Sequence, residues 1–371
     1  MKVLIISNSY FFSGAEKSLL DYLEKSNNTQ NYFLCISNAD TETIKTFSKY
    51  NTIRLPLIWF SFTYNPIILI NYLFNIIFIS IKIILIMSER KIDIIYSNTI
   101  KAQIYCLFIK LLTGKTVLWH VRDNTRSGFL KWILTKISDK IICNSNHILK
   151  QFSESSKCLV IYNGVDLFTF SSNGIINENI REKLNLPKYT ILIAQVGQIT
   201  EWKKQLDFIY CANKILQKET NIHFLIVGDD LSGNEENYLN QIKNEIMRLR
   251  LNNNITLIGH KIDIREVYTQ IDILLHTAID EPFGRVLIEA MAMEKPVVAY
   301  NCGGPKEIIL NGETGFLIEP HNYTEMAQKT ILLLNSRTMR EKFGKNGRVR
   351  VSEYFNLNEY TRKIDQLLFC L

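Results

Sequence analysis

Short apolar runs rich in β-branched residues recur along the chain, separated by longer segments with helical spacing. The runs have the length and composition of buried parallel strands, and they cover residues 2–7, 32–36, 52–55, 92–97, 116–120, 140–144, 190–196, 222–227 and 255–259. Helical spacing is clear in two of the intervening segments, at Leu19 and Leu23 and at Leu206, Ile209 and Leu216. This alternation predicts an α/β fold with parallel sheets.

The most apolar segment, residues 66–87, is long enough to span a bilayer. Asn71, Asn75, Lys82 and Glu89 nevertheless fall on one helical stripe, which favours a helix with one wet edge. Because the segment lies between two predicted strands, we expect a buried crossover helix. A helix that dips into the membrane interface and a true membrane span are the alternatives.

A chain of 371 residues suggests two domains of ordinary size. The polar stretch 171–178 fits a linker, so we expect domains over residues 1–170 and 171–352. The seven cysteines are scattered without a C-x-x-C pair, which argues against a zinc site or a disulfide framework. The apolar run at the start is too short for a signal peptide, so a cytoplasmic location is expected.

Positive charge is concentrated in the N-terminal half. Residues 1–175 hold 19 Lys and Arg against 11 Asp and Glu, a net charge of +8. The remaining residues carry a net charge of −1, which gives +7 for the whole chain. The sequence contains no nucleic-acid-binding motif, so we expect no nucleic acid partner. An anionic membrane surface or a phosphorylated acceptor fits the charge better.

Residues 281–289 form the densest group of candidate site residues, with Glu281 and Glu289 flanking Pro282-Phe283-Gly284-Arg285-Val286. Pro282 suits the first position of a helix, which would leave the N–H groups of the next three residues at a helix N-terminus. Such an end attracts phosphate, and Gly284 permits close approach of a ligand to the backbone. One carboxylate would lie on each side of the phosphate, as a sugar nucleotide requires.

The N-terminal half offers two further candidates and one charged cluster. Gly14 opens a helix after the first strand, and His120 ends a strand at the sheet edge where α/β proteins bind ligands. A basic cluster with interleaved aromatic residues is either a solvated helix face or a membrane or acceptor patch; it comprises Arg122, Arg126, Lys131, Lys136 and Lys140.

With these motifs in place, the chain resembles the retaining glycosyltransferases of family 4, which have the two-domain GT-B fold. The resemblance rests on the 281–289 block, on Gly303-Gly304 after it, on Asn163-Gly164-Val165-Asp166, and on residues 312–317. It implies two Rossmann-like doubly wound domains facing each other across a cleft. It also implies that residues 353–371 form a helix returning to the first domain.

The resemblance implies a role for each candidate residue. Glu281, His120 and Lys203 would contact the donor sugar and its phosphates, Gly14 would approach the phosphates, and Glu289 would bind the ribose. His260 and Lys261 would lie near the nucleobase. Three positions depart from the family pattern, because Gln198 replaces an arginine and Lys204 and Asp230 each replace a glycine. A lysine supplies charge but not the bidentate fork of arginine.

The implied activity is transfer of a sugar, with retention, from a nucleoside-diphosphate sugar to a hydroxyl of a saccharide or lipid-linked acceptor. No D-x-D motif occurs, so we expect no metal and no other cofactor. The expected site of action is the inner face of the cytoplasmic membrane, with the protein bound peripherally. A sugar-nucleotide epimerase with the same fold and a non-catalytic partner subunit are the alternatives.

Overall fold

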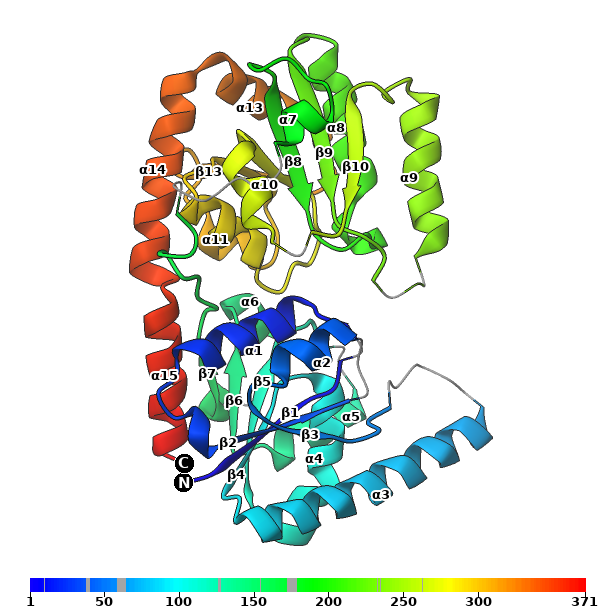
Figure 1. Cartoon of the computed structure of the whole chain (residues 1–371), viewed down its shortest axis with the longest axis vertical. Coiled ribbons are helices and arrows are strands. Elements are labelled where there is room, and N and C mark those ends of the chain that lie inside the picture. The colour runs from blue at the N-terminus through cyan, green and yellow to red at the C-terminus, as the bar shows by residue number, and fades with distance from the viewer. Residues whose placement is uncertain are drawn as a thin grey trace. The chain divides into compact units, whose positions relative to one another are not determined.

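Two parallel β-sheets, each covered by helices, organise the chain (Figure 1). The computed structural model describes residues 1–9, 11–37, 41–58, 65–125, 128–153, 155–171, 179–231, 233, 235–261 and 263–371. Residues 1–164 with 357–371 form one compact unit, here unit 1, and residues 165–356 form unit 2. The prediction of two doubly wound α/β domains is confirmed.

Unit 1 contains a seven-stranded parallel sheet in the order β3-β2-β1-β4-β5-β6-β7. Its strands are β1 (Val3–Ser7), β2 (Tyr32–Ile36), β3 (Asn51–Arg54), β4 (Ile94–Ser97), β5 (Thr116–Val121), β6 (Lys140–Cys143) and β7 (Cys158–Val160). The strand order reverses between β1 and β4, so the carboxyl ends of these two strands flank the switch point of the sheet.

The helices of unit 1 cover both faces of this sheet. They are α1 (Gly14–Lys25), α2 (Thr41–Phe47), α3 (Pro66–Arg90), α4 (Ile100–Thr113), α5 (Phe129–Ile137), α6 (Asn146–Leu149) and α15 (Leu357–Phe369). Val3 and Ile5 of β1 pack with α1 and α15, whereas Leu4 and Ile6 pack with α3 and α4. Alternate residues of a strand point to opposite faces, so α3 and α4 lie on the face opposite α1 and α15.

Helix α3 connects β3 to β4, as predicted for a crossover, but the prediction that it is buried is wrong. Within its 25 residues only Ile79, Ser80, Ile83 and Met87 are buried. Asn75, expected on a wet edge, instead accepts a hydrogen bond from Tyr105 Oη of α4 at 2.9 Å. The polar stripe therefore faces the protein at this position, and apolar side chains face outward.

Unit 2 contains a six-stranded parallel sheet in the order β10-β9-β8-β11-β12-β13. Its strands are β8 (Ile191–Val196), β9 (Ile222–Val227), β10 (Ile255–Gly259), β11 (Ile273–His276), β12 (Val297–Tyr300) and β13 (Gly315–Ile318). Its helices are α7 (Ile180–Lys183), α8 (Gln205–Leu216), α9 (Glu236–Arg248), α10 (Arg265–Gln270), α11 (Arg285–Ala292), α12 (Pro305–Ile308), α13 (Tyr323–Asn335) and α14 (Arg337–Tyr354).

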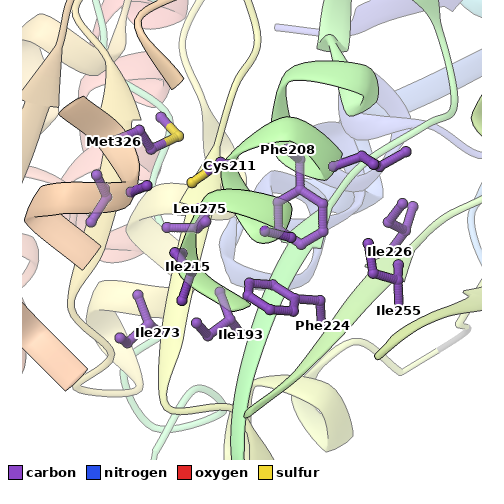
Figure 2. Close-up of a cluster of buried hydrophobic side chains, with 14 of the residues drawn as sticks. Ile193, Phe208, Cys211, Ile215, Phe224, Ile226, Ile255, Ile273, Leu275 and Met326 are labelled. Atoms are coloured by element: carbon purple, nitrogen blue, oxygen red, sulfur yellow. The ribbon is translucent and has the colours of Figure 1, made fainter. Parts of the chain in front are cut away.

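One core cluster of unit 2 lies between its sheet and helices that include α8, α9 and α13. Figure 2 shows Phe208 and Ile215 of α8 directed toward Ile193, Phe224 and other strand residues. The rings of Phe208 and Phe224 meet edge to face, with centroids 5.8 Å apart. This packing fixes α8, and with it the loop between β8 and α8 that carries Lys203.

The chain passes between the units at residues 164/165 and 356/357, whereas the sequence suggested 170/171 and 352/353. The difference has a local cause. Val165 donates a backbone hydrogen bond to Phe355 at 2.9 Å, and Arg348 donates to the carbonyls of Leu167 and Phe170. Residues 165–170 are therefore held by unit 2.

Candidate functional site

The principal candidate site of unit 2 lies where its strand order reverses, between β8 and β11. Ligands of open α/β sheets bind outside the carboxyl ends of the strands at this switch point. His276 is the last residue of β11, and Lys203 lies in a 3₁₀ turn after β8, Glu201–Lys203. Both side chains converge on Glu281, in the loop between β11 and α11.

Glu281 is held by two contacts that end on the same oxygen. Lys203 Nζ lies 2.6 Å from Glu281 Oε2, and His276 Nε2 lies 3.1 Å from it. The three side chains are largely buried; Lys203, at 12% exposure, is the most accessible. The ammonium of Lys203 also lies 4.1 Å from the centroid of the Trp202 ring.

The surroundings of Glu281 keep it ionised. Burial raises the pKa of its carboxyl, but the charge of Lys203 and the hydrogen bond from His276 outweigh burial and lower the pKa to about 2. Burial lowers the pKa of His276, so this imidazole is neutral at pH 7 and donates its Nε2 proton to the carboxylate. An ionised carboxylate can only accept hydrogen bonds, so Glu281 is an acceptor at pH 7.

Helix α11 begins at Arg285, so the prediction that Pro282 occupies the first helical position is wrong. Residues 281–284 form a turn instead, in which Gly284 adopts φ +101°. A side chain is strained at this φ, which explains the glycine. Leu287 N donates to Gly284 O at 3.0 Å, and the first turn of α11 begins four residues after Glu281.

Two glycines after β12 pack closely against the backbone of this turn. Gly304 N donates to Glu281 O at 2.8 Å. A Cβ atom on Gly303 would lie 2.2 Å from Glu281 O, and one on Gly304 would lie 2.1 Å from Phe283 O. The Gly-Gly pair after β12 is therefore required for the backbone of residues 281–283 to lie where it does. Phe283 turns its ring inward onto Phe355, with centroids 5.9 Å apart.

Glu289 follows one turn into α11 and is 6% exposed. Arg285 Nη2 donates to its Oε1 at 3.1 Å, and Tyr268 Oη donates to its Oε2 at 3.2 Å. Val286 is half-buried, and its carbonyl accepts a second, longer hydrogen bond from Tyr268. The carboxylate of Glu289 is thus fixed in orientation beside the first turn of the helix.

Gln198 and Lys204, two of the departures from the family pattern, differ in their structural setting. Gln198 is half-buried in the loop after β8, and its carbonyl accepts from Gln205 Nε2 at 2.8 Å. Lys204 has φ +51° and ψ 48° and caps the N-terminus of α8. This left-handed conformation accounts for the glycine expected at the position.

We expect Lys204→Gly to stabilise the protein by about 1 kcal/mol, because glycine adopts a positive φ without the steric cost borne by lysine. Chemical denaturation measures the change. The matched control is Lys243→Gly in the exposed interior of α9, which should destabilise by about 1 kcal/mol. A loss of stability in Lys204→Gly would contradict the strain argument.

His260 and Lys261 follow β10. His260 is exposed and Lys261 is half-buried. None of the contacts described above joins either residue to the Glu281 cluster. Their predicted role beside a nucleobase rests on position at the carboxyl edge of the sheet alone.

In unit 1, Gly14 is the first residue of α1, at the switch point of the sheet. Ser13 caps the helix, and Glu16 accepts a hydrogen bond from the Ser13 backbone in return. Glu16 is buried and also accepts from Ser7 Oγ at 3.1 Å. Burial raises the pKa of Glu16, and the hydrogen bonds from Ser13 and Ser7 and the charge of Arg122 oppose the rise. Gly14 itself is exposed.

His120 lies in β5, one residue before the strand end, and is fully buried. Its Nδ1 lies 2.6 Å from Tyr96 Oη, and the two rings stack. Burial raises the pKa of Tyr96 and lowers that of His120, so Tyr96 donates and the imidazole is neutral. The remaining proton of His120 is then on Nε2, which is buried with no hydrogen-bond partner among the described residues.

The basic cluster does not form a single exposed patch. Arg122 is buried and donates to Asn98, Asn163 and Tyr360 at 2.8, 3.1 and 3.2 Å, so its assignment to a surface patch is wrong. Lys131 donates to the Gln151 carbonyl and lies over the Phe152 ring. Lys140 is half-buried in β6, and Lys136 is exposed. Arg126 lies outside the described residues.

Sequence reasoning did not single out His276, Tyr96 or Tyr268, which orient the carboxylates and the imidazole. A signal for His276 was present, because it follows the short apolar run 273–275 just ahead of the Glu281 block. Tyr96 and Tyr268 had no such signal, since their partners are 24 and 21 residues away in the sequence.

Comparison with known proteins agrees with this architecture. The family model for glycosyl transferases group 1 matches residues 176–350. The capsular polysaccharide biosynthesis glycosyltransferase CapM of Staphylococcus aureus is 30% identical over 295 residues, which cover 74% of this chain and 76% of CapM.

Two solved structures match almost the whole chain. Anabaena HepE in complex with UDP-glucose has a TM-score of 0.85 and 24% identity, covering 100% of both chains. A glycosyltransferase from Rickettsia africae has a TM-score of 0.81 and 25% identity, covering 99% of this chain and 97% of its own.

Proposed function

The chain belongs to the glycosyl transferases of group 1 and has the GT-B fold, and on this premise we propose that it is a retaining hexosyltransferase of family 4. Its donor is a nucleoside-diphosphate sugar, and its acceptor is a hydroxyl of a saccharide or a lipid-linked saccharide. The observation that carries the proposal is the cluster of Lys203, Glu281 and His276 at the switch point of the unit 2 sheet.

The chemistry of this cluster suits a sugar diphosphate. Glu281 is ionised and accepts hydrogen bonds, so it binds sugar hydroxyls. Lys203 supplies a positive charge, and the first turn of α11 supplies N–H groups for phosphate oxygens. The carboxylate of Glu289, oriented by Arg285 and Tyr268, binds the ribose. HepE was crystallised with UDP-glucose, which makes uridine diphosphate sugars the first donors to test.

In the proposed reaction the acceptor hydroxyl attacks the anomeric carbon on the face that the diphosphate leaves. The bond from that carbon to the phosphate oxygen breaks, and the leaving phosphate takes the acceptor proton, so no separate base is needed. Lys203 and the helix N–H groups stabilise the negative charge that develops on the diphosphate. The proposal uses no metal ion or other cofactor.

We further propose that the enzyme works at the inner face of the cytoplasmic membrane, in the synthesis of a cell-surface polysaccharide or glycolipid. Unit 1 holds 21 Lys and Arg against 12 Asp and Glu, a net charge of +9, whereas unit 2 holds 22 against 24, a net charge of −2. A positive unit 1 favours an anionic surface. The name of CapM, a capsular polysaccharide enzyme, agrees with such a product.

Binding of nucleotides and their sugars tests the donor site. We expect one of the UDP, GDP or ADP series to stabilise the protein by roughly 2–3 kcal/mol at 100 times its Kd, measured by thermal shift. Lys203→Met should abolish the shift. Lys218→Met, which removes an exposed lysine beyond the end of α8, should keep it.

Turnover of the stabilising donor then tests the reaction. Release of nucleoside diphosphate that depends on a saccharide or lipid acceptor, with the donor's anomeric configuration kept in the product, is the expected result. Isomerisation of the donor without acceptor would instead identify an epimerase. A protein that binds no nucleotide in any series would contradict the donor site and favour a non-catalytic subunit.

A further inference from the structure

Helix α3 carries a continuous apolar stripe on its outward face, here called the outer stripe. Its members recur at intervals of three or four residues, which places them on one side of a helix: Ile67, Ile70, Phe74, Phe78, Ile81 and Leu85. Each is 47–69% exposed. Ile68, Leu69 and Leu73 widen the stripe near the start of the helix, and each is 38–50% exposed.

The inner face of α3 carries the polar contacts. Asn75 accepts a hydrogen bond from Tyr105 Oη, and Ser80 Oγ donates to Tyr105 O at 3.2 Å. In a water-exposed helix the polar side chains face outward and the apolar ones inward. In the first half of α3 large apolar side chains are exposed to the outside, and Figure 1 shows this half extending away from the sheet of unit 1.

A large exposed apolar surface of this kind marks contact with a membrane or with another protein. The helix is long and apolar enough to cross a bilayer, with a mean hydropathy of 2.3 in its most apolar 18-residue window and only 17% of that window buried. Length alone does not distinguish a helix that spans the membrane from one that lies in its interface.

The topology of unit 1 excludes a span. Helix α3 joins β3 and β4, which belong to the same seven-stranded sheet. A single crossing would place these strands on opposite sides of the membrane. Ile58 N donates to Tyr105 Oη at 3.0 Å, and Asn75 Nδ2 donates to Pro56 O at 3.4 Å, so the chain just before α3 and the first half of α3 both lie against unit 1.

The charge of unit 1 decides between a lipid surface and a second copy of the chain. Two copies meeting through α3 would bring together two units of net charge +9, which repel each other. An anionic bilayer attracts the same charge and also solvates the outer stripe. Lys82 fits this surface, because its ammonium lies 4.3 Å from the Phe78 ring centroid, alongside the stripe.

We propose that α3 lies in the interface of an anionic bilayer, parallel to its plane, with the outer stripe inserted among the acyl chains. This proposal specifies how the membrane attachment proposed above is made: by hydrophobic insertion through α3, with the surrounding positive charge as a second contribution. It involves unit 1 alone and needs neither donor nor acceptor.

Vesicle sedimentation of the full chain tests the insertion, using phosphatidylglycerol–phosphatidylcholine vesicles and pure phosphatidylcholine vesicles over a salt series. Wild type should bind the anionic vesicles more tightly, and a substantial part of the binding should persist at 1 M salt. A variant with Ile70→Gln, Phe74→Gln and Phe78→Gln should lose on the order of 100-fold or more in partitioning, because three inserted side chains no longer favour the acyl region.

The matched control removes three exposed apolar side chains from unit 2, by Tyr189→Gln, Met247→Gln and Leu332→Gln. It should bind as wild type does. Circular dichroism checks that both variants fold. A Phe74→Trp variant provides a second measurement that needs no disruptive change: its fluorescence should shift to the blue on anionic vesicles and be quenched by brominated acyl chains.

Three results would overturn the insertion. Binding that disappears at high salt and is equal in wild type and the α3 variant would show attachment by charge alone. Absence of vesicle binding would show that the protein does not attach to a bilayer through α3. If analytical ultracentrifugation showed that wild type is a dimer and the α3 variant a monomer, the outer stripe would be assigned to contact with a second copy of the chain. Because no sugar is present, none of these results bears on the transferase reaction.

Discussion

Replacing Glu281 by Gln is expected to lower the rate of transfer by a factor on the order of 10² or more while the fold is retained. A contact that stabilises developing charge or holds the reacting sugar commonly has an effect of this size. Gln has the same shape as Glu but brings no negative charge, so the ammonium of Lys203 loses the ion pair that positions it 2.6 Å away. Steady-state assays with the donor identified by thermal shift measure the change.

The pH dependence of stability provides an independent measurement on the same variant. The pKa of Glu281 is about 2 in the folded protein against an ordinary value of 4.5. A lowered pKa adds stability that is fully present above pH 4.5 and is lost as the pH falls toward 2, on the order of 3 kcal/mol in total. Glu281→Gln should lack this loss.

Glu313→Gln is the matched control, since Glu313 is an exposed carboxylate of the same unit. It should keep both the activity and the wild-type pH dependence. A fully active Glu281→Gln enzyme would remove Glu281 from the proposed mechanism, whatever its stability.

Replacing Gly303 by Ala is expected to abolish detectable donor binding, because the new Cβ atom would lie 2.2 Å from the carbonyl oxygen of Glu281. Either the turn of residues 281–284 or the loop after β12 must move, and a shift of about 1 Å in a positioned group can reduce the rate 10²-fold. Overpacking of this kind also destabilises by roughly 1–3 kcal/mol. Calorimetric titration with the nucleotide and chemical denaturation measure the two effects.

Gly312→Ala separates steric overlap from backbone strain. Gly303 and Gly312 both have positive φ, +58° and +80°, but a Cβ on Gly312 would meet no atom within 4 Å. The control variant should therefore lose some stability and keep donor binding. Equal loss of binding in both variants would attribute the effect to strain in general rather than to contact with the Glu281 turn.

The sequence predicted nine of the thirteen strands found in the described residues, but it predicted the geometry of the candidate site less well. Strand runs are read from local composition, and parallel strands buried on both faces have a strong signal. The 281–289 block was recognised because its residues are contiguous in the sequence, so its pattern is also local. The start of α11 was misplaced because Pro282 is suited to a helix start, and only the tertiary contact between Gly304 and Glu281 reveals the turn.

Burial was the property that the sequence predicted least well. Arginine is a residue type typical of protein surfaces, but Arg122 is buried. Its guanidinium donates hydrogen bonds to Asn98, Asn163 and Tyr360, which come from three distant parts of unit 1. Conversely, α3 has the composition of a buried helix and exposes its apolar stripe. In both cases the deciding partners lie far away in the sequence, so no local pattern indicates them.

The C-terminal helix α15 has a consequence for the order in which the protein folds during synthesis. Leu357, Tyr360, Ile364 and Leu368 complete a core of unit 1 that begins with Val3, and Asp365 accepts a hydrogen bond from Tyr22 at 2.6 Å. Residues 1–164 are translated before unit 2 but lack this part of their core until residues 357–371 have left the ribosome. Unit 2 is one continuous segment, so the domain translated second is the one able to fold first.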